Sequence, residues 1–293
     1  MRVVKILILI LLCTYNQILF AHPFLWQVTG EQSFYLFGTI HLPDPRVTVL
    51  SPEVEKALSE STSFYAELDL TESNTMLITQ SMWLKGDDTL HDLLSSDLKE
   101  DITRYLKSIN PELNLEYFAK QKIWVLAVTL TVLEQQLKYP GHLPLDSSLY
   151  QKASLLGLQT GGLETVQEQL GVFDSLSIED QIQFLTDTVE FLHQNNNESN
   201  DFVESTLNAY LDGELNELMT HLMSYMKDND FYADLLNNLI DNRNIQMTED
   251  IVHLVTGNPD EKYFFAVGVG HFWGENSINL LLQEQGYSIQ VIN

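Results

Sequence analysis

Each end of this chain carries an aromatic, β-prone segment that leads into the same short motif, Gly-x-x-His. Residues 33–37 run into Gly38-Thr39-Ile40-His41, and residues 262–267 run into Gly268-Val269-Gly270-His271. A strand brings its last residues to the edge of a sheet, where open α/β folds bind their ligands. Glycine there permits close backbone approach, so that the histidine can turn into a cleft. We therefore expect the two ends of the chain to fold side by side.

The N-terminal part predicts a hairpin of residues 25–28 and 33–37, with the second strand running into the first motif. Pro43 and Pro45 are expected to forbid regular structure directly after it. Ser51 followed by Pro52 is typical of a helix start, so a short helix is predicted to about Ser59. Residues 63–70 then predict a strand that ends in acidic residues.

From about residue 71 to residue 255 the apolar residues recur at three- and four-residue spacing, which predicts helices. The exception is residues 157–164, which indicate a short strand with a glycine-rich exit. After the second motif, residues 277–285 predict a helix and residues 287–292 a last strand. The predicted helices of the middle region are 89–107, 113–137, 146–156, 178–193, 201–227 and 231–254.

These patterns predict one α/β domain of an α+β-like kind, residues 22–293. A small mixed sheet would be assembled from the N- and C-terminal strands, with a large helical insertion at about residues 71–255 covering it.

The first residues have the pattern of a secretory signal peptide. Basic residues precede a short apolar run, and Ala21 offers a small residue for cleavage, so residues 1–21 are expected to be removed. The only cysteine, Cys13, lies in this segment, which excludes disulfides and a cysteine nucleophile from the mature chain. We expect a secreted or periplasmic protein with no stable membrane anchor.

The charge balance narrows the class of partner. The chain has 15 basic and 41 acidic residues, a formal net charge of −26. Such a field repels nucleic acid and anionic membranes. A nucleic-acid partner is therefore excluded, and the sequence does not fix the oligomeric state.

Two carboxylates accompany the histidines. Glu67 and Asp69 lie two residues apart, so both face the same side of the predicted strand. Acids at a strand end are costly to bury unless they are paired or ligate a metal. Two imidazoles with one or two carboxylates suit a divalent ion such as Zn, Mn or Co. The alternative is that the acids are simply solvated and the histidines cap turns.

Five blocks of the sequence, in order, resemble the landmarks of the TraB/GumN family, which includes the Tiki metalloproteases. The resemblance spans about residues 26–291. Because the mature chain has no cysteine and no segment like the membrane anchor of the animal members, we expect a bacterial GumN-like member. The blocks are residues 34–43, 66–70, 162–169, 241–244 and 264–272.

The resemblance implies a divalent-metal peptidase or related hydrolase acting on a peptide or protein. His41 and His271 would be ligands, with Glu67 as ligand or general base. Arg243 would hold a substrate carboxylate or stabilise an oxyanion. Glu164 would be an acid that orients a ligand, and Gly38 and Gly268 would support the turns.

Two other functions stay open from the sequence. One is a metal-independent, esterase-like hydrolase that uses a histidine as base. The other is a non-catalytic protein of the same fold that binds haem or a peptide. The sequence contains neither the Gly-x-Ser-x-Gly elbow of serine hydrolases nor a His-Glu-x-x-His motif.

Overall fold

The computed structural model describes residues 24–197, 202–224 and 226–292. The expected signal peptide, residues 1–21 with Cys13, lies outside these residues. Among the helices that are described, none has the length and hydrophobicity needed to cross a membrane.

One six-stranded mixed sheet forms the centre of the fold, in the order β4-β3-β5-β2-β1-β6. The four strands β4, β3, β5 and β2 run parallel, whereas β1 pairs antiparallel with both β2 and β6. The predicted α/β class and the assembly of the sheet from both chain ends are confirmed. The strands are β1 Leu25–Thr29, β2 Ser33–Thr39, β3 Ser63–Leu68, β4 Gln159–Glu164, β5 Tyr263–Gly268 and β6 Ser288–Val291.

The C-terminal strand β5 lies between β3 and β2, and its sequence explains this central place. Residues 263–267 are all buried, which is the near-continuous apolar run of a parallel strand covered on both faces. Phe264 stacks on Phe64 of β3 and meets Phe37 of β2, so rings from three strands pack together.

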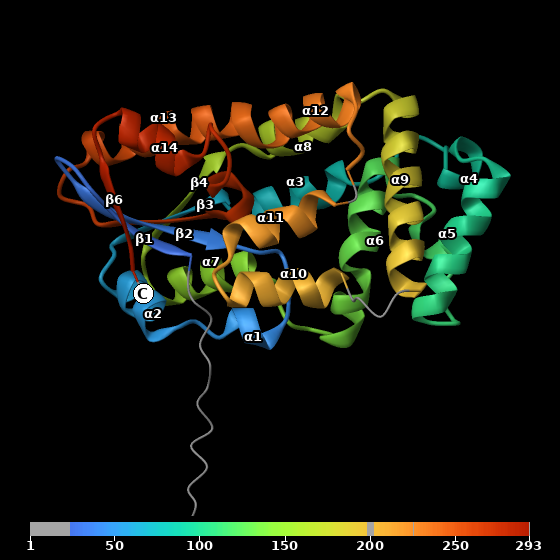
Figure 1. Ribbon diagram of the computed structural model, residues 1–293, viewed down its shortest axis with the longest axis horizontal. Coiled ribbons are helices and arrows are strands. Elements are labelled where there is room, and N and C mark those ends of the chain that lie inside the picture. Colours follow the sequence, from blue (N-terminus) through green and yellow to red (C-terminus); the bar gives the residue numbers. More distant parts are fainter. Residues whose placement is uncertain (1–23, 198–201, 225, 293) are drawn as a thin grey trace, which may run out of the picture.

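Helices cover both faces of the sheet and extend beyond one end of it. Figure 1 shows α13 and α14 on one side of the strands, with α2 and α7 on the other. The helices in chain order are α1 Pro45–Thr48, α2 Pro52–Ser59, α3 Glu72–Ser81, α4 Leu90–Leu93, α5 Ser96–Ile109, η1 Leu115–Phe118, α6 Ile123–Lys138, α7 Leu145–Leu156, α8 Val166–Asp174, α9 Ile178–Asn197, α10 Phe202–Leu211, α11 Leu215–Met223, α12 Asp230–Leu236, η2 Asn237–Asp241, α13 Asn242–Gly257, η3 Val269–Phe272 and α14 Ile278–Glu284.

The buried apolar residues form two clusters. One contains the sheet and the helices that pack on it. The other is purely helical and is built mainly from α5, α6 and α9, which Figure 1 shows together at the end of the molecule away from the sheet. The long helices α5, α6 and α9 thus bury their apolar sides against one another.

The structure corrects four sequence predictions about element boundaries. The helices predicted at 89–107 and 113–137 are each interrupted, so that the first becomes α4 and α5 and the second becomes η1 and α6. Pro45 does not prevent regular structure: it starts the one-turn helix α1, because Asp44 caps that helix and proline is tolerated at a first helical position. The helix predicted at 201–227 is broken into α10 and α11 by Gly213, whose φ of 74° no helical residue adopts.

Candidate functional site

Four neighbouring parallel strands deliver the predicted site residues to one edge of the sheet. In the strand register, Thr39 of β2 lies beside Gly268 of β5, and Ala66 of β3 lies beside Ala266 of β5. His41 and His271 therefore follow adjacent strands, and Glu67 comes from the strand on the other side of β5. Glu164 ends β4, which pairs with β3. Carboxyl ends of parallel strands are where α/β folds place ligands.

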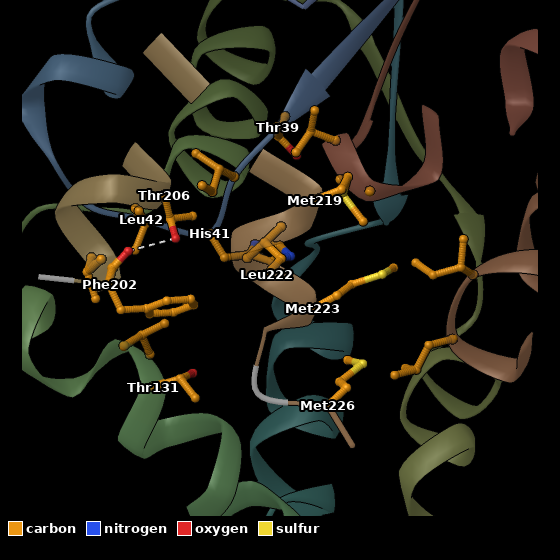
Figure 2. Close-up of a pocket in the computed structure, with 18 of the residues that line it drawn as sticks. Thr39, His41, Leu42, Thr131, Phe202, Thr206, Met219, Leu222, Met223 and Met226 are labelled. Carbon is orange, nitrogen blue, oxygen red and sulfur yellow. Dashed lines mark hydrogen bonds between the residues drawn. The ribbon is translucent and has the colours of Figure 1, made fainter. Parts of the chain in front are cut away.

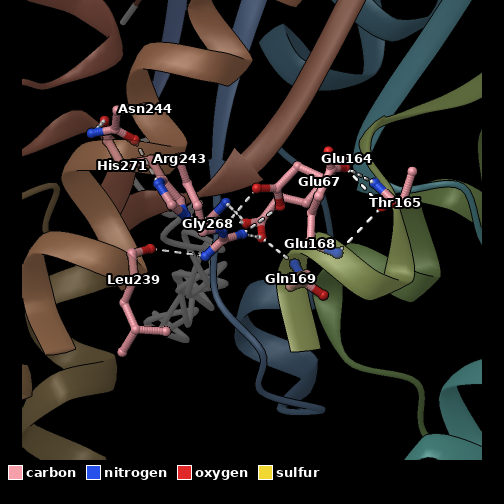
Figure 3. Close-up of polar contacts among 10 residues, drawn as sticks. All are labelled: Glu67, Glu164, Thr165, Glu168, Gln169, Leu239, Arg243, Asn244, Gly268 and His271. Atoms are coloured by element: carbon pink, nitrogen blue, oxygen red, sulfur yellow. Dashed lines mark hydrogen bonds and ion pairs between the residues drawn. The ribbon is translucent and has the colours of Figure 1, made fainter. Parts of the chain in front are cut away.

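Glu67 is the centre of a buried polar network (Figure 3). Its Oε1 accepts a hydrogen bond of 2.6 Å from the backbone N–H of Gly268. Its Oε2 accepts from Gln169 Nε2 at 2.7 Å and from Arg243 Nη2 at 2.6 Å. Burial alone would raise the pKa of Glu67, but the charge of His271 in its protonated form, together with the charges of Arg243 and His41, outweighs burial and lowers this pKa to about 2. Glu67 is thus a carboxylate throughout the physiological pH range.

Arg243 is held by two carboxylates at once. Its Nε and Nη2 donate to the two oxygens of Glu164, both at 2.7 Å, in the forked geometry of a guanidinium–carboxylate pair. Nη2 also bonds Glu67, and Nη1 donates to the Leu239 carbonyl at 2.9 Å. Burial raises the pKa of Glu164 despite this pairing. Because all three guanidinium nitrogens already have protein partners, Arg243 is placed to fix Glu67.

His271 is buried, and Asn244 fixes its tautomer. The Asn244 amide nitrogen donates to the carbonyls of His271 and Asn276, so its oxygen must face the ring, where Nδ1 lies 2.6 Å away. Burial lowers the pKa of His271 to about 4, so the ring is neutral at pH 7. Nδ1 therefore carries the proton and donates a hydrogen bond to Asn244 Oδ1. The lone pair of Nε2 is left free. Nε2 lies 3.8 Å from Glu67 Oε1.

His41 differs from His271 in exposure and charge. Its Nδ1 lies 2.8 Å from Asp146 Oδ1, and its side chain is 65% exposed. The negative charge of Asp146 raises the pKa of His41 to about 9, against the opposing effect of desolvation. Water around so exposed a ring weakens the pairing. No described residue forms a hydrogen bond with Nε2 of His41. In both histidines, therefore, Nδ1 lies close to an oxygen atom, whereas Nε2 makes no hydrogen bond to a described residue.

The glycines of the two motifs are needed for close approach. A Cβ added to Gly268 would lie 2.9 Å from Glu67 Oε1, on the side of the site. A Cβ added to Gly38 would lie 2.9 Å from Phe24 Cβ and 3.1 Å from Val269. The lack of a side chain at Gly268 therefore leaves room for the Glu67 carboxylate. The lack of a side chain at Gly38 allows the packing that brings the two motifs together.

A small cavity of about 60 Å³ has five polar or charged residues in its wall, and we call it the polar cavity after them. They are Thr39, His41, Glu67, Asp146 and Gln169, and the apolar residues Ala66, Leu68, Leu70 and Ala266 complete the wall. Such a volume accommodates a few water molecules. The other acid of the predicted pair, Asp69, lies apart from this cavity lining and accepts a hydrogen bond from the Tyr150 hydroxyl on α7.

The residues of the site match a divalent metal in donor type. Neutral imidazole nitrogens and a carboxylate are its usual ligands, and hydrogen bonds from the far ring nitrogen to an oxygen acceptor are the usual support. The two free Nε2 atoms and the polar cavity fit such an ion. Within the described ranges, however, no three His, Cys, Asp or Glu side chains form a ready-made metal cluster. Ligation by His41 would also displace its proton.

Three supporting residues were not singled out from the sequence: Asn244, Asp146 and Gln169. The position of Gln169 could have been predicted from the sequence, because Thr165 and Glu168 form a capping box that predicts the start of α8 directly after β4. The helix start turns Gln169 toward Glu67. Asn244 lies in the block 241–244 that resembles the family. Neither Asn244 nor Asp146 had a signal for its pairing with a histidine, because these pairings join distant parts of the chain.

Comparisons with known proteins identify the family of the chain. The family model described as the TraB/PrgY/gumN family matches residues 24–291. The chain is 30% identical to "Metalloprotease TIKI2" of Danio rerio, over 92% of this chain and 61% of that protein. It is 28% identical to "Metalloprotease TIKI2" of Xenopus tropicalis, over 92% of this chain and 60% of that protein. It is 23% identical to "Uncharacterized protein YbaP" of Escherichia coli (strain K12), over 87% of this chain and 89% of that protein.

No solved structure gives a significant match to the chain. The chain spans about three fifths of the length of the TIKI relatives and most of the length of the bacterial one. The match of the family model runs from β1 to β6 and so includes every strand of the sheet. The chain therefore belongs to the TraB/PrgY/gumN family.

Proposed function

We propose that this protein is a metal-dependent hydrolase that cleaves peptide bonds. The observation that carries the proposal is the position of His41, His271 and Glu67 at one edge of the sheet, at the ends of three adjacent parallel strands. Among the described residues, neither histidine has a hydrogen-bond partner at Nε2, and Nε2 of His271 lies 3.8 Å from Glu67 Oε1. The printed names of the TIKI relatives, which call those proteins metalloproteases, support a peptidase activity.

In this proposal, His271 and His41 would hold a divalent ion, with Glu67 as a further ligand or as the base beside it. Asn244 and Asp146 keep the two rings in the ligating orientation. A divalent ion bound there would lower the pKa of a water molecule and polarise the carbonyl of the substrate.

Glu67 has a second task beside that water. As a carboxylate it can accept a proton from the attacking water, which requires its oxygens to be aimed and anionic. Gly268, Gln169 and Arg243 hold the two oxygens in place, and Gly268 and Arg243 also lower the pKa of Glu67. Arg243 thus acts through Glu67, as a positioning residue.

The test is cleavage of a pooled peptide library by the purified protein, read by mass spectrometry. The protein is first stripped with a chelator and then given Mn²⁺, Co²⁺ or Zn²⁺. We expect cleavage only with metal, and a loss of about 100-fold or more in His41→Ala and His271→Ala. His253→Ala removes an exposed histidine of α13 and should leave the rate unchanged. Equal cleavage by stripped and metal-loaded protein would contradict the proposal.

A second candidate is a metal-independent hydrolase in which His41 and Asp146 act as an acid–base pair. Their 2.8 Å contact, and the lack of a three-residue metal cluster among the described side chains, favour it. The same library distinguishes the two. Cleavage that resists chelator and is lost in both His41→Ala and Asp146→Asn would support this candidate.

Export belongs to the proposal as well. With residues 1–21 as signal peptide, the substrate would be met outside the cytoplasm. N-terminal sequencing of the protein recovered from a secreting host should begin at His22. An intact Met1 there would contradict it.

A further inference from the structure

An apolar cavity adjoins the site, on the other side of His41 from the polar cavity. Its volume is about 330 Å³, and Met219, Leu222 and Met223 of α11 form part of its wall. Figure 2 shows the three methionines 219, 223 and 226 along one side, with Phe202 and Thr131 on the other. We call this cavity the methionine pocket.

The methionine pocket is too large to be a packing defect. Protein interiors are close-packed, with few voids larger than a water molecule. Ligand pockets start at about 300 Å³ and are mainly apolar with a few polar groups. An apolar cavity of about 150 Å³ already holds a benzene ring, so this one holds about two groups of that size.

The lining selects the chemistry of the occupant. Among the described residues of the pocket wall, His41 is the one titratable side chain, and the others are aliphatic, aromatic, methionine, glycine or threonine. Away from His41, a charged or strongly polar group would therefore lose its hydration without gaining a partner. Methionine is flexible and polarisable, so the wall can adapt to side chains of different shapes.

The position of the pocket connects the occupant to the reaction. Thr39 and His41 line both this pocket and the polar cavity that contains Glu67. The second motif contributes Gly268 and Gly270 to the same wall. A peptide residue with its side chain in the methionine pocket would thus place its backbone carbonyl beside His41, where the polar cavity begins.

We propose that the methionine pocket binds bulky apolar side chains next to the scissile bond, so that the enzyme selects peptides with an apolar pair such as Leu-Phe. The selection of a cleavage site rests on the proposed peptidase function. The binding of apolar side chains itself is independent of turnover. Discrimination by such a pocket is worth about 10- to 200-fold.

The first test measures binding without catalysis. The probe is N-phenyl-1-naphthylamine, whose fluorescence rises in apolar surroundings, and the competitors are N-acetyl-Leu-Phe-amide and N-acetyl-Ser-Glu-amide. We expect the apolar dipeptide to displace the probe at least about tenfold more effectively. Met223→Trp and Leu222→Trp fill the pocket and should weaken probe binding to a similar extent. Met76→Trp, on an exposed position of α3, should not change it.

Several outcomes would overturn the inference. Equal displacement by both dipeptides, or unchanged probe binding in both filled variants with a retained thermal transition, would do so. Displacement by decanoate but not by the apolar dipeptide would assign the pocket to an acyl chain.

The second test uses the metal-loaded protein on the peptide library. We expect cleavage sites flanked by large apolar residues, with this preference reduced in Met223→Trp. Cleavage without apolar preference would refute the inference and leave the peptidase standing. No cleavage with any metal would refute the peptidase, and the binding test would still decide the pocket.

Discussion

At the scale of single residues, the site is a set of charges that support one another. Glu67 and Glu164 are both largely buried, with side chains 12% and 3% exposed, and one guanidinium, that of Arg243, serves both. The three charges are strongly coupled, because removal of the Arg243 cation leaves two carboxylates unpaired in a poorly hydrated place. Neutral His271 adds no charge to this balance at pH 7.

Replacement of Arg243 by methionine should therefore be costly. We expect Arg243→Met to lower the free energy of unfolding by about 3–5 kcal/mol at pH 7, because it leaves buried carboxylates unpaired. Adding Glu164→Gln should recover part of the loss, since it removes one of the two charges. Urea unfolding followed by circular dichroism measures both.

The matched control for that experiment is Arg104→Met on α5, whose ion pairs are exposed. It should cost about 1 kcal/mol or less. A loss in Arg243→Met no larger than in Arg104→Met would show that the Glu67–Arg243–Glu164 network contributes little to stability.

At the scale of elements, the ends of the strands are shaped by the turns that follow them. The strand β5 passes Glu67 so closely that a Cβ at position 268 would lie 2.9 Å from Glu67 Oε1. After strand β2, the turn that follows His41 leads into α1. There Asp44 accepts hydrogen bonds from Arg46, and Arg46 also donates a hydrogen bond to Glu204 of α10. This chain of contacts ties the first motif to the helical insertion.

Two glycines of the second motif should respond differently to the same change. Gly268→Ala brings a methyl group to 2.9 Å from Glu67 Oε1, so the carboxylate must move, at a cost of about 1–3 kcal/mol. Gly270→Ala meets only Ile240 and Met219 at 3.7 Å, an ordinary contact, and should change stability by less than about 0.5 kcal/mol. Thermal unfolding compares the two variants. Equal losses would contradict the close approach.

The Asp44 contact predicts a pH dependence. Burial alone would raise the pKa of Asp44, but its hydrogen bonds to Arg46 outweigh burial and lower it below the usual value. A carboxylate with a lowered folded-state pKa contributes stability above its unfolded pKa of about 3.9, and this is lost as pH falls through the folded value. Asp44→Asn should thus cost about 1–3 kcal/mol at pH 7 and progressively less below about pH 4.

Urea unfolding of the wild type and Asp44→Asn from pH 7 to pH 3 tests this sign. Asp260→Asn, at an exposed position before β5, is the control and should show no such difference. A gap between the wild type and Asp44→Asn that grows as pH falls would be the wrong sign for the contact described.

The elements that could be predicted from the sequence are those with strong local patterns. The aromatic strands, the helix after Ser51 and most helices of the insertion are examples. α3 escaped prediction because none of its residues is buried, so it has no apolar stripe to detect. The place of β5 between β3 and β2 is a matter of strand order, which no local pattern encodes.

The same limit applies to the site. His41, His271 and Glu67 stand at strand ends with recognisable motifs, and the structure places them at one edge of the sheet. Asn244 and Asp146 have meaning only through histidines far away in sequence. The use of Arg243 as a partner of Glu67 depends on the approach of α13 to β3 and β4, which follows from packing.

At the scale of the whole molecule, the sheet and the insertion have separate tasks. The sheet brings the motifs from both chain ends together, because the C-terminal strand β5 lies between the N-terminal strands β3 and β2. The insertion adds the fourth parallel strand, Gln169 and the wall of the methionine pocket. The proposed metal site and the methionine pocket therefore adjoin at His41, which lines both the polar cavity and the methionine pocket.

The most direct measurement of the central claim is a crystal structure of the protein soaked in Co²⁺ or Mn²⁺, with anomalous data. The account predicts one ion bound by His41 Nε2 and His271 Nε2, with the Glu67 carboxylate beside it, at bonds of about 2 Å. His271→Ala, soaked in the same way, should lose the peak. An ion bound elsewhere at saturating metal, or two rings with no anomalous peak between them, would contradict the account.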